Sequence, residues 1–178
     1  MSKLLVRRYE DPVLRKQALP IEAITPEIEK LGRDMVETMI LHKGVGLAGP
    51  QVGVMLRIFV IQDERVNEVG EWIVSEPEII INPVLSKPSQ EKEVMQEGCL
   101  SLPGLHVDVV RPRTIHIRYQ NVKGEWIEEL LTDFRARVMM HENDHLNGVL
   151  TIDRMDKKER KKVEPQLQAI DKKYHKSL

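Results

Sequence analysis

The chain has 178 residues, 41% hydrophobic and 31% charged, which predicts one globular domain with a core of its own. Its formal net charge of −1 argues against a global electrostatic role in binding DNA, and no apolar run suits a signal peptide or a membrane span. The single cysteine, Cys99, excludes an internal disulfide and is typical of a reducing compartment, so we expect a cytoplasmic protein.

The first half of the chain mixes helix and strand signals. Asp11-Pro12 can start a short helix, and Thr25-Pro26 is a stronger start because a capping Thr precedes a Pro in the first turn. Apolar side chains then recur at helical spacing, which predicts a helix over 26–41. The segments that follow are expected to be a glycine-rich loop (44–54), a buried strand (56–62), a polar loop that can form a hairpin at Val69-Gly70 (63–77), a short strand closed by Pro83 (79–82) and a polar turn (86–92).

The second half predicts strands and then a long helix. Strands are expected over 107–110, over 114–120, where apolar and polar residues alternate cleanly, and over 125–131. Thr132 or Asp133 is expected to cap a helix that runs to about 147, where Gly148 stops it. The whole pattern predicts an α+β fold, with antiparallel or mixed sheets packed around that helix, an N-terminal helix and a C-terminal helical tail.

The most informative motif lies in MMHENDHLNG (139–148). His141 and His145 are four residues apart, so their rings project from one helix face and can bind one metal ion. Glu142 is displaced around the helix, where a carboxylate can serve as a general base without being a ligand. For this composition, H-E-x-x-H is expected by chance roughly 0.02 times. The motif predicts a metal site, and two histidines that merely share a helix face are the alternative.

A catalytic metal site usually has three protein ligands and an open position. Cys99, in QEGCLSLPG (96–104), is the strongest candidate for the third ligand, because a thiolate with two imidazoles suits Zn²⁺ or Fe²⁺. The downstream candidates lie in a charged run that is typical of a solvated helix face: Asp153, Asp156, Glu159, Glu164 and His175.

Three segments together resemble the peptide deformylases, in the order and at the separations typical of that family. They are GVGLAGPQ (44–51), EGCLS (97–101) and HENDH (141–145). DPVLR near the start, INP at 81–83, and LPG followed by VVRP extend the resemblance to about residue 155. The chain departs from the family pattern at Gly49, where Ala is usual, and at Met140, where Gln is common.

The resemblance implies a metal-dependent hydrolase that removes the formyl group from the N-terminal formylmethionine of nascent polypeptides and releases formate. It implies that Cys99, His141 and His145 bind one divalent metal ion. This ligand set suits Zn²⁺, Fe²⁺, Co²⁺ or Ni²⁺, and of these we expect Fe²⁺ as the native ion. The resemblance also implies that Glu142 is the general acid and base, that the backbone of Gly46 lies along the substrate, and that the oxyanion is stabilised by the Gln51 side chain and the Leu100 N–H.

Such an enzyme also needs an apolar slot for methionine. Val45, Phe134 and Val138, with the surroundings of Leu100, are candidates, although core packing accounts for each of them equally well. Glu97 or Asp144 could orient a ligand imidazole, but most helical aspartates are simply solvated. The remaining histidines have no partners by spacing and are expected to be ordinary surface or strand residues: His42, His106, His116 and His175.

Residues 1–155 are expected to form the catalytic domain, and residues 156–178 a basic helical extension of it. From Asp153 to Leu178 there are nine Lys or Arg against five Asp or Glu, a net of +4, and Pro165 interrupts or restarts the helix. Such a run is usually a solvated face, and the functional alternative is a transient contact with ribosomal RNA.

Two other functions stay open at this point. One is a different metallohydrolase, such as a peptidase with a downstream third ligand. The other is a non-catalytic protein with a structural metal, although a closed structural site needs four protein ligands. Because the sequence shows no transit peptide, a bacterial cytoplasmic protein is favoured over an organellar one.

Overall fold

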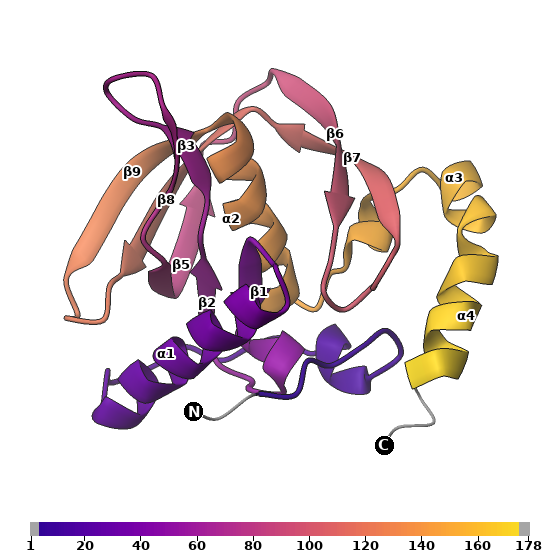
Figure 1. The fold of residues 1–178 in the computed structure, drawn as a ribbon, viewed down its shortest axis with the longest axis horizontal. Coiled ribbons are helices and arrows are strands. Elements are labelled where there is room, and N and C mark those ends of the chain that lie inside the picture. Colours follow the sequence, from indigo (N-terminus) through magenta and orange to yellow (C-terminus); the bar gives the residue numbers. More distant parts are fainter. Residues whose placement is uncertain (1–3, 175–178) are drawn as a thin grey trace.

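The fold is built on an antiparallel sheet, seen in a computed structural model that describes residues 4–174 (Figure 1). Its strand order is β1-β2-β5-β8-β9, with the bounds Gly46–Ala48, Ile58–Ile61, Glu78–Ser86, Thr114–Gln120 and Trp126–Thr132. Two further hairpins pair β3 (Glu64–Val66) with β4 (Trp72–Val74), and β6 (Lys92–Gly98) with β7 (His106–Pro112).

The helices lie around this sheet. They are α1 (Pro26–Leu41), α2 (Asp133–Leu146), α3 (Lys157–Lys162) and α4 (Glu164–Tyr174), with 3₁₀ turns η1 (Pro12–Arg15), η2 (Gly49–Val52) and η3 (Thr151–Arg154). Figure 1 shows α2 between the main sheet and the β6–β7 hairpin, with α3 and α4 beyond that hairpin. None of the helices in the described part of the chain is long and apolar enough to cross a membrane. The arrangement confirms an α+β fold with antiparallel sheets around the motif-bearing helix.

Helix α2 is buried on nearly all sides, which places its polar side chains in the interior. Its apolar residues, among them Val138 and Met139, pack with Phe59 of β2 and Ile117 of β8 in one core cluster. The departure at Met140 belongs to the same cluster, so this side chain serves packing. A second cluster joins η1, β7 and α4, and a third joins α1 to β1 and β2.

The C-terminal end of α2 is fixed by a Schellman motif. Gly148 has φ +72°, its N–H donates to the carbonyl of His145 at 3.2 Å, and the N–H of Val149 donates to the carbonyl of Asp144 at 3.0 Å. The predicted stop at Gly148 is therefore confirmed. At the other end Thr132 is the capping residue by position, but its side chain makes no capping hydrogen bond.

Most of the predicted elements are confirmed, two assignments were wrong and one strand was missed. The helices over 12–15 and 26–41, the hairpin around Val69-Gly70 and the strands over 114–120 and 125–131 are present. The segment 44–54 is not only a loop, because 46–48 pair as an edge strand. Pro83 does not close β5, because a register shift between Ile81 and Val84 accommodates it in a bulge, where a missing N–H costs no ladder bond. Strand β6 was not predicted at all, because only Glu97 along it is buried.

Candidate metal centre and active site

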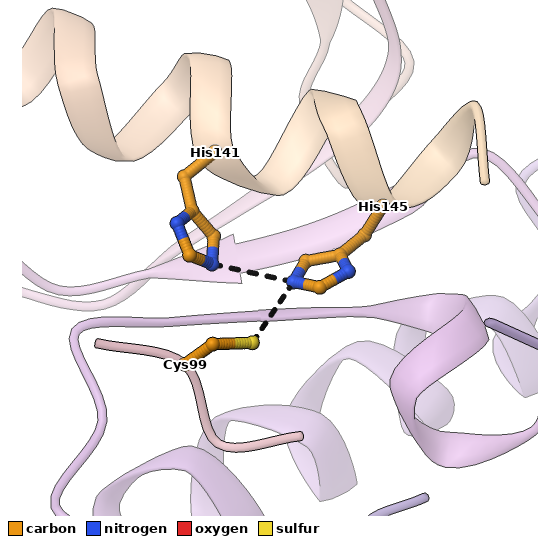
Figure 2. Close-up of side chains that lie close together, drawn as sticks. All are labelled: Cys99, His141 and His145. Carbon is orange, nitrogen blue, oxygen red and sulfur yellow. Dashed lines mark hydrogen bonds between the residues drawn. The ribbon is translucent and has the colours of Figure 1, made fainter. Parts of the chain in front are cut away.

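Three metal-ligating side chains converge between α2 and the segment that follows β6. The rings of His141 and His145 point from α2 toward the sulfur of Cys99, as Figure 2 shows. The two Nε2 atoms lie 3.2 Å apart, Nε2 of His145 lies 3.3 Å from Sγ of Cys99, and all the ligand atoms lie within 4.8 Å of one another. The structure thus brings together the three residues that the sequence named as ligands.

The spacing of these atoms fits a tetrahedral cation. Metal–N and metal–S bonds of about 2.05 and 2.3 Å at tetrahedral angles separate two nitrogens by about 3.3 Å and a sulfur from a nitrogen by about 3.6 Å. The observed separations of 3.2 and 3.3 Å agree to within a few tenths of an ångström. A hydrogen-bonded cluster is a poorer account, because one hydrogen on Nε2 of His145 cannot point at both neighbours. The residues present therefore fit a divalent metal.

Glu97 orients the His141 ring through Nδ1, on the side of the ring away from the Nε2 atom that faces His145. Its carboxylate accepts from Nδ1 of His141 at 3.0 Å, and from Arg111 at 2.6 and 2.9 Å and Arg137 at 2.7 Å. Burial alone would raise the pKa of Glu97, but the hydrogen bonds from Arg111 and His141 hold it well below its usual range. The ionised carboxylate leaves Nε2 of His141 free to face the metal.

Asp144, the other candidate for orienting an imidazole, has a different role. It is buried and accepts from Arg111 at 2.9 Å and from Arg154 at 2.5 and 3.1 Å. A chain of charges thus runs from the half-exposed Arg154 through Asp144 and Arg111 to Glu97. Both the solvated and the imidazole-orienting expectations for Asp144 were wrong, since it supports Glu97 through Arg111.

Glu142 lies against the edge strand β1. A Cβ on Gly46 would overlap the Glu142 carboxylate, with the carboxyl carbon only 2.7 Å away, so this close approach requires glycine. One carboxylate oxygen, Oε2, is buried with no hydrogen-bond partner in the described part of the chain. In the metal-free protein burial raises the pKa of Glu142 to about 7. This carboxyl can therefore take up and release a proton near neutral pH.

The orientation of the Gln51 amide follows from its hydrogen bonds. Its Oε1 accepts from the N–H of Ala48 at 2.8 Å, so the NH₂ group must face the other way. That group donates to Sγ of Cys99 at 3.5 Å and to Oγ of Ser101 at 3.2 Å. The buried side chain of Gln51 thus aims a donor at the candidate metal site.

A cavity of about 490 Å³ opens beside the three candidate ligands. Its walls include Cys99, His141 and every residue that the sequence named for substrate and oxyanion: Val45, Gly46, Gln51, Leu100, Phe134, Val138 and Glu142. His42 and His106 also line it, and both are exposed, His106 on β7, as expected for surface or strand histidines. His116 lies exposed on β8 as expected, and His175 lies outside the described residues.

The downstream acids have partners elsewhere. Asp153 pairs with Arg15 and accepts from the Leu150 N–H, and Asp156 caps α3. Glu159 and Glu164 pair with basic neighbours on the C-terminal helices. Among the described residues, the donor group found for a metal is Cys99 with the two histidines, which disfavours a downstream third ligand.

Known proteins resemble this chain over most of its length. A sequence model described as polypeptide deformylase matches residues 3–161. A peptide deformylase of Thermotoga petrophila is 47% identical over 150 residues, which cover 84% of this chain and 85% of that protein. The crystal structure of peptide deformylase from Thermotoga maritima is similar with a TM-score of 0.79 and 42% identity, covering 88% of this chain and 99% of that one. A plant peptide deformylase is similar with a TM-score of 0.88 and 33% identity, covering 99% and 94%.

Proposed function

The chain belongs to the peptide deformylase family, and we propose which of its residues carry out the reaction. A peptide deformylase is a metal-dependent hydrolase that removes N-terminal formyl groups from nascent polypeptides. Cys99, His141 and His145 would hold one divalent cation, and the convergence of their donor atoms within 4.8 Å is the observation that carries this assignment. When bound, such an ion supplies Lewis acidity that activates water and polarises the formyl carbonyl.

Glu142 would move the proton. Its Oε2, which is buried and has no hydrogen-bond partner in the described part of the chain, would accept a proton from the attacking water as oxygen adds to the formyl carbon. The same carboxyl would then deliver that proton to the amine nitrogen as the C–N bond breaks, which releases formate and the free N-terminus. In the metal-free protein burial raises the pKa of Glu142 to about 7, and a cation held by the three ligands would lower it.

Gln51 and Leu100 would stabilise the negative charge that develops on the formyl oxygen. The NH₂ group of Gln51 faces the site because its carbonyl oxygen is held by Ala48, and the backbone N–H of Leu100 would be the second donor. Removing one donor of this kind typically costs about 2.7–4 kcal/mol of transition-state stabilisation.

The apolar part of the cavity would bind the methionine side chain. Val45 and Phe134 are half-exposed at the cavity, whereas Val138 is buried in its wall. Half-exposed apolar side chains at a cavity suit a ligand that covers them. The backbone of Gly46, on the edge strand β1, would lie along the substrate peptide.

The decisive test of Glu142 is Glu142→Gln, assayed as formate release from formyl-Met-Ala. We expect kcat to fall about 10²–10⁴-fold while the bound metal per chain stays unchanged. Glu159→Gln, on the exposed surface of α3, is the matched control and should keep full activity. Wild-type turnover by Glu142→Gln would refute the acid and base assignment.

The identity of the metal and of its ligands calls for a second experiment. We propose Fe²⁺ as the native ion, with Zn²⁺, Ni²⁺ and Co²⁺ as substitutes, because a thiolate and two imidazoles accept all four. Anaerobic purification with metal analysis tests this. Cys99→Ser should lose most of the bound metal, whereas a peptidase with a downstream ligand would keep it.

We also propose that residues 1–155 form the catalytic domain and 156–178 a basic extension of it, in a protein of the bacterial cytoplasm. The exposed lysines of α3 and α4 would make a transient, salt-dependent contact with ribosomal RNA. Reversing Lys161 and Lys162 to Glu should weaken ribosome binding and flatten its salt dependence. Unchanged binding would remove this role.

A further inference from the structure

Three consecutive residues near the N-terminus hold the backbone around the candidate site. The N–H of Arg7 donates to the carbonyl of Gln51 at 2.7 Å, and the N–H of Tyr9 donates to the carbonyl of Ser101 at 2.9 Å. Between them, the guanidinium of Arg8 donates to the carbonyl of Leu100. The contacts to residues 100 and 101 bridge 92 residues of sequence, and the Arg7 and Arg8 contacts meet both residues proposed as oxyanion donors.

The segment held by Arg8 has no strand pairing of its own. It leaves β6 at Gly98 and reaches β7 only at His106, so no strand ladder orders residues 99–105. Its internal hydrogen bonds join Leu102 to Cys99 at 2.9 Å and Leu105 to Leu102 at 3.1 Å. Neither bond involves the carbonyl of Leu100, and in the described part of the chain the Arg8 guanidinium is the donor found for it.

Arg8 is itself held by the end of the last helix. Its guanidinium carbon lies 5.3 Å from the centre of the Tyr174 ring, the last residue of α4, within the range of a cation–π contact. Leu167 and Ile170 of the same helix are buried in the cluster that contains Leu102 and Leu105, so the helix and the segment share a core. The ring thus keeps a flexible arginine in one place.

We propose that Arg8 is a positioning residue for deformylation: held by Tyr174, its guanidinium fixes the Leu100 carbonyl and so aims the Leu100 N–H at the formyl oxygen. The Leu100 N–H lies in the peptide plane of the Cys99 carbonyl, which accepts from the Leu102 N–H at 2.9 Å, and the next plane carries the Leu100 carbonyl held by Arg8. The two bonds together restrain the φ and ψ of Leu100 between the planes, so loss of the Arg8 bond frees one side of the donor. A charged donor is stronger than a neutral one, which suits Arg8 to this role. The inference rests on the proposed role of Leu100.

Arg8 also lines the cavity, and a contact with the substrate is the competing explanation. The two explanations differ in the kinetic constant that changes. Loss of a positioning residue misplaces a donor that acts in the transition state, so kcat falls and KM stays. Loss of a group that binds the substrate raises KM and leaves kcat unchanged.

The test compares Arg8→Ala, Arg8→Lys and Tyr174→Leu in formate release from formyl-Met-Ala. We expect kcat of Arg8→Ala to fall about 10–100-fold with KM within a factor of two, as misplacement near a reacting group does. Arg8→Lys, which keeps the charge, should recover most of kcat, and Tyr174→Leu should lose less than Arg8→Ala. The matched control is Arg118→Ala, whose arginine lies 4.2 Å over the ring of Trp126 and pairs with Glu128, far from the segment.

A second readout is independent of turnover. Amide hydrogen exchange of residues 97–105 should be faster in metal-free Arg8→Ala than in wild type and unchanged in Arg118→Ala. Wild-type kcat in Arg8→Ala, a loss carried by KM alone, or unchanged exchange would each overturn the proposal. If Glu142→Gln kept full activity, the assigned roles would fail, but exchange would still decide whether Arg8 orders the segment.

Discussion

At the scale of single residues, Gly46 determines where the Glu142 carboxylate can lie. A methyl group on Gly46 would occupy the position of that carboxylate, so Gly46→Ala must displace it or push β1 away. We expect kcat for formate release to fall about 100-fold, since a shift of about 1 Å near the chemistry has such an effect. Steady-state kinetics on the purified variant measures it.

The same change in a Glu142→Gln background is the control. If Gly46→Ala acts through Glu142, it should cost little further activity there, because the two effects are not additive for residues in contact. A full additional loss in the double variant would show that Gly46 acts on the substrate strand instead.

The charge of Glu97 contributes to the stability of the metal-free protein, because two arginines pair with it. Arg111 and Arg137 are both buried against it, so Glu97→Gln leaves buried cations underpaired and should cost about 3–5 kcal/mol of unfolding free energy near pH 7. Urea unfolding measures the loss. Glu91→Gln, which breaks an exposed pair with Arg113, should cost no more than about 1 kcal/mol.

The unfolding free energy lost in Glu97→Gln should become smaller as the pH falls. Arg111 and His141 hold the pKa of Glu97 well below its usual value, against the effect of burial, so the folded protein binds this proton less tightly than the unfolded chain. The stabilisation is full above the unfolded pKa of about 4.3 and is lost as the pH falls below it. The difference in unfolding free energy between wild type and Glu97→Gln should therefore decrease from pH 5 to pH 3. A constant difference would contradict the assignment.

The candidate metal ligands were predictable from local spacing and residue chemistry, whereas the residues that support them were not. His141 and His145 share a helix face, and Cys99 is the single thiol. Three arginines support the site through partners that are distant in sequence. The separation is 14 residues for Arg111 and Glu97, 40 for Arg137 and Glu97, and 92 for Arg8 and Leu100, and nothing in the local sequence indicates these contacts. Such contacts depend on tertiary packing, which a single sequence does not display.

At the scale of elements, the end of α2 is set by one glycine. Gly148 has φ +72°, and a Cβ there would lie 2.6 Å from the carbonyl oxygen of Arg15. Gly148→Ala therefore adds a steric clash to the free-energy cost of a left-handed φ. The candidate site on α2 lies one helical turn away. Gly70→Ala is the matched control, because Gly70 has φ +86° but nothing within 4 Å of its Cβ.

The control separates the two costs of Gly148→Ala. Gly70→Ala should lose about 1 kcal/mol for the left-handed backbone alone, and Gly148→Ala at least about 1–2 kcal/mol more. Denaturant unfolding of both variants measures the difference. Equal losses of unfolding free energy in the two variants would mean that the backbone at Arg15 moves aside with no cost in free energy.

Elements with a regular hydrophobic pattern were predictable, and β6 was not. Strand β8 alternates buried and exposed residues, so its period of two is visible in the sequence. Strand β6 carries Val94 exposed and a charged residue, Glu97, buried, which reverses the usual pattern. Its pairing with β7 and the buried arginines stabilise it, and both are nonlocal.

At the scale of the whole molecule, the C-terminal helix completes a core that begins at the N-terminus. Leu167 is fully buried in a cluster with Leu14 of η1 and Val109 of β7. Deleting its side chain should leave a cavity in this shared core, so Leu167→Ala is expected to cost about 2–5 kcal/mol of unfolding free energy. The loss should appear in one cooperative transition that includes the catalytic part.

Gln168→Ala is the control, because its side chain is exposed on the same helix and should change stability by no more than about 0.5 kcal/mol. Calorimetry with tryptophan fluorescence as a second probe separates the outcomes. If α4 were an independent appendage, Leu167→Ala would melt the tail in a separate step and leave the main transition in place. A single shifted transition instead follows if one core holds η1, β7 and α4, because the packing that anchors the tail also supports the segment bearing Cys99.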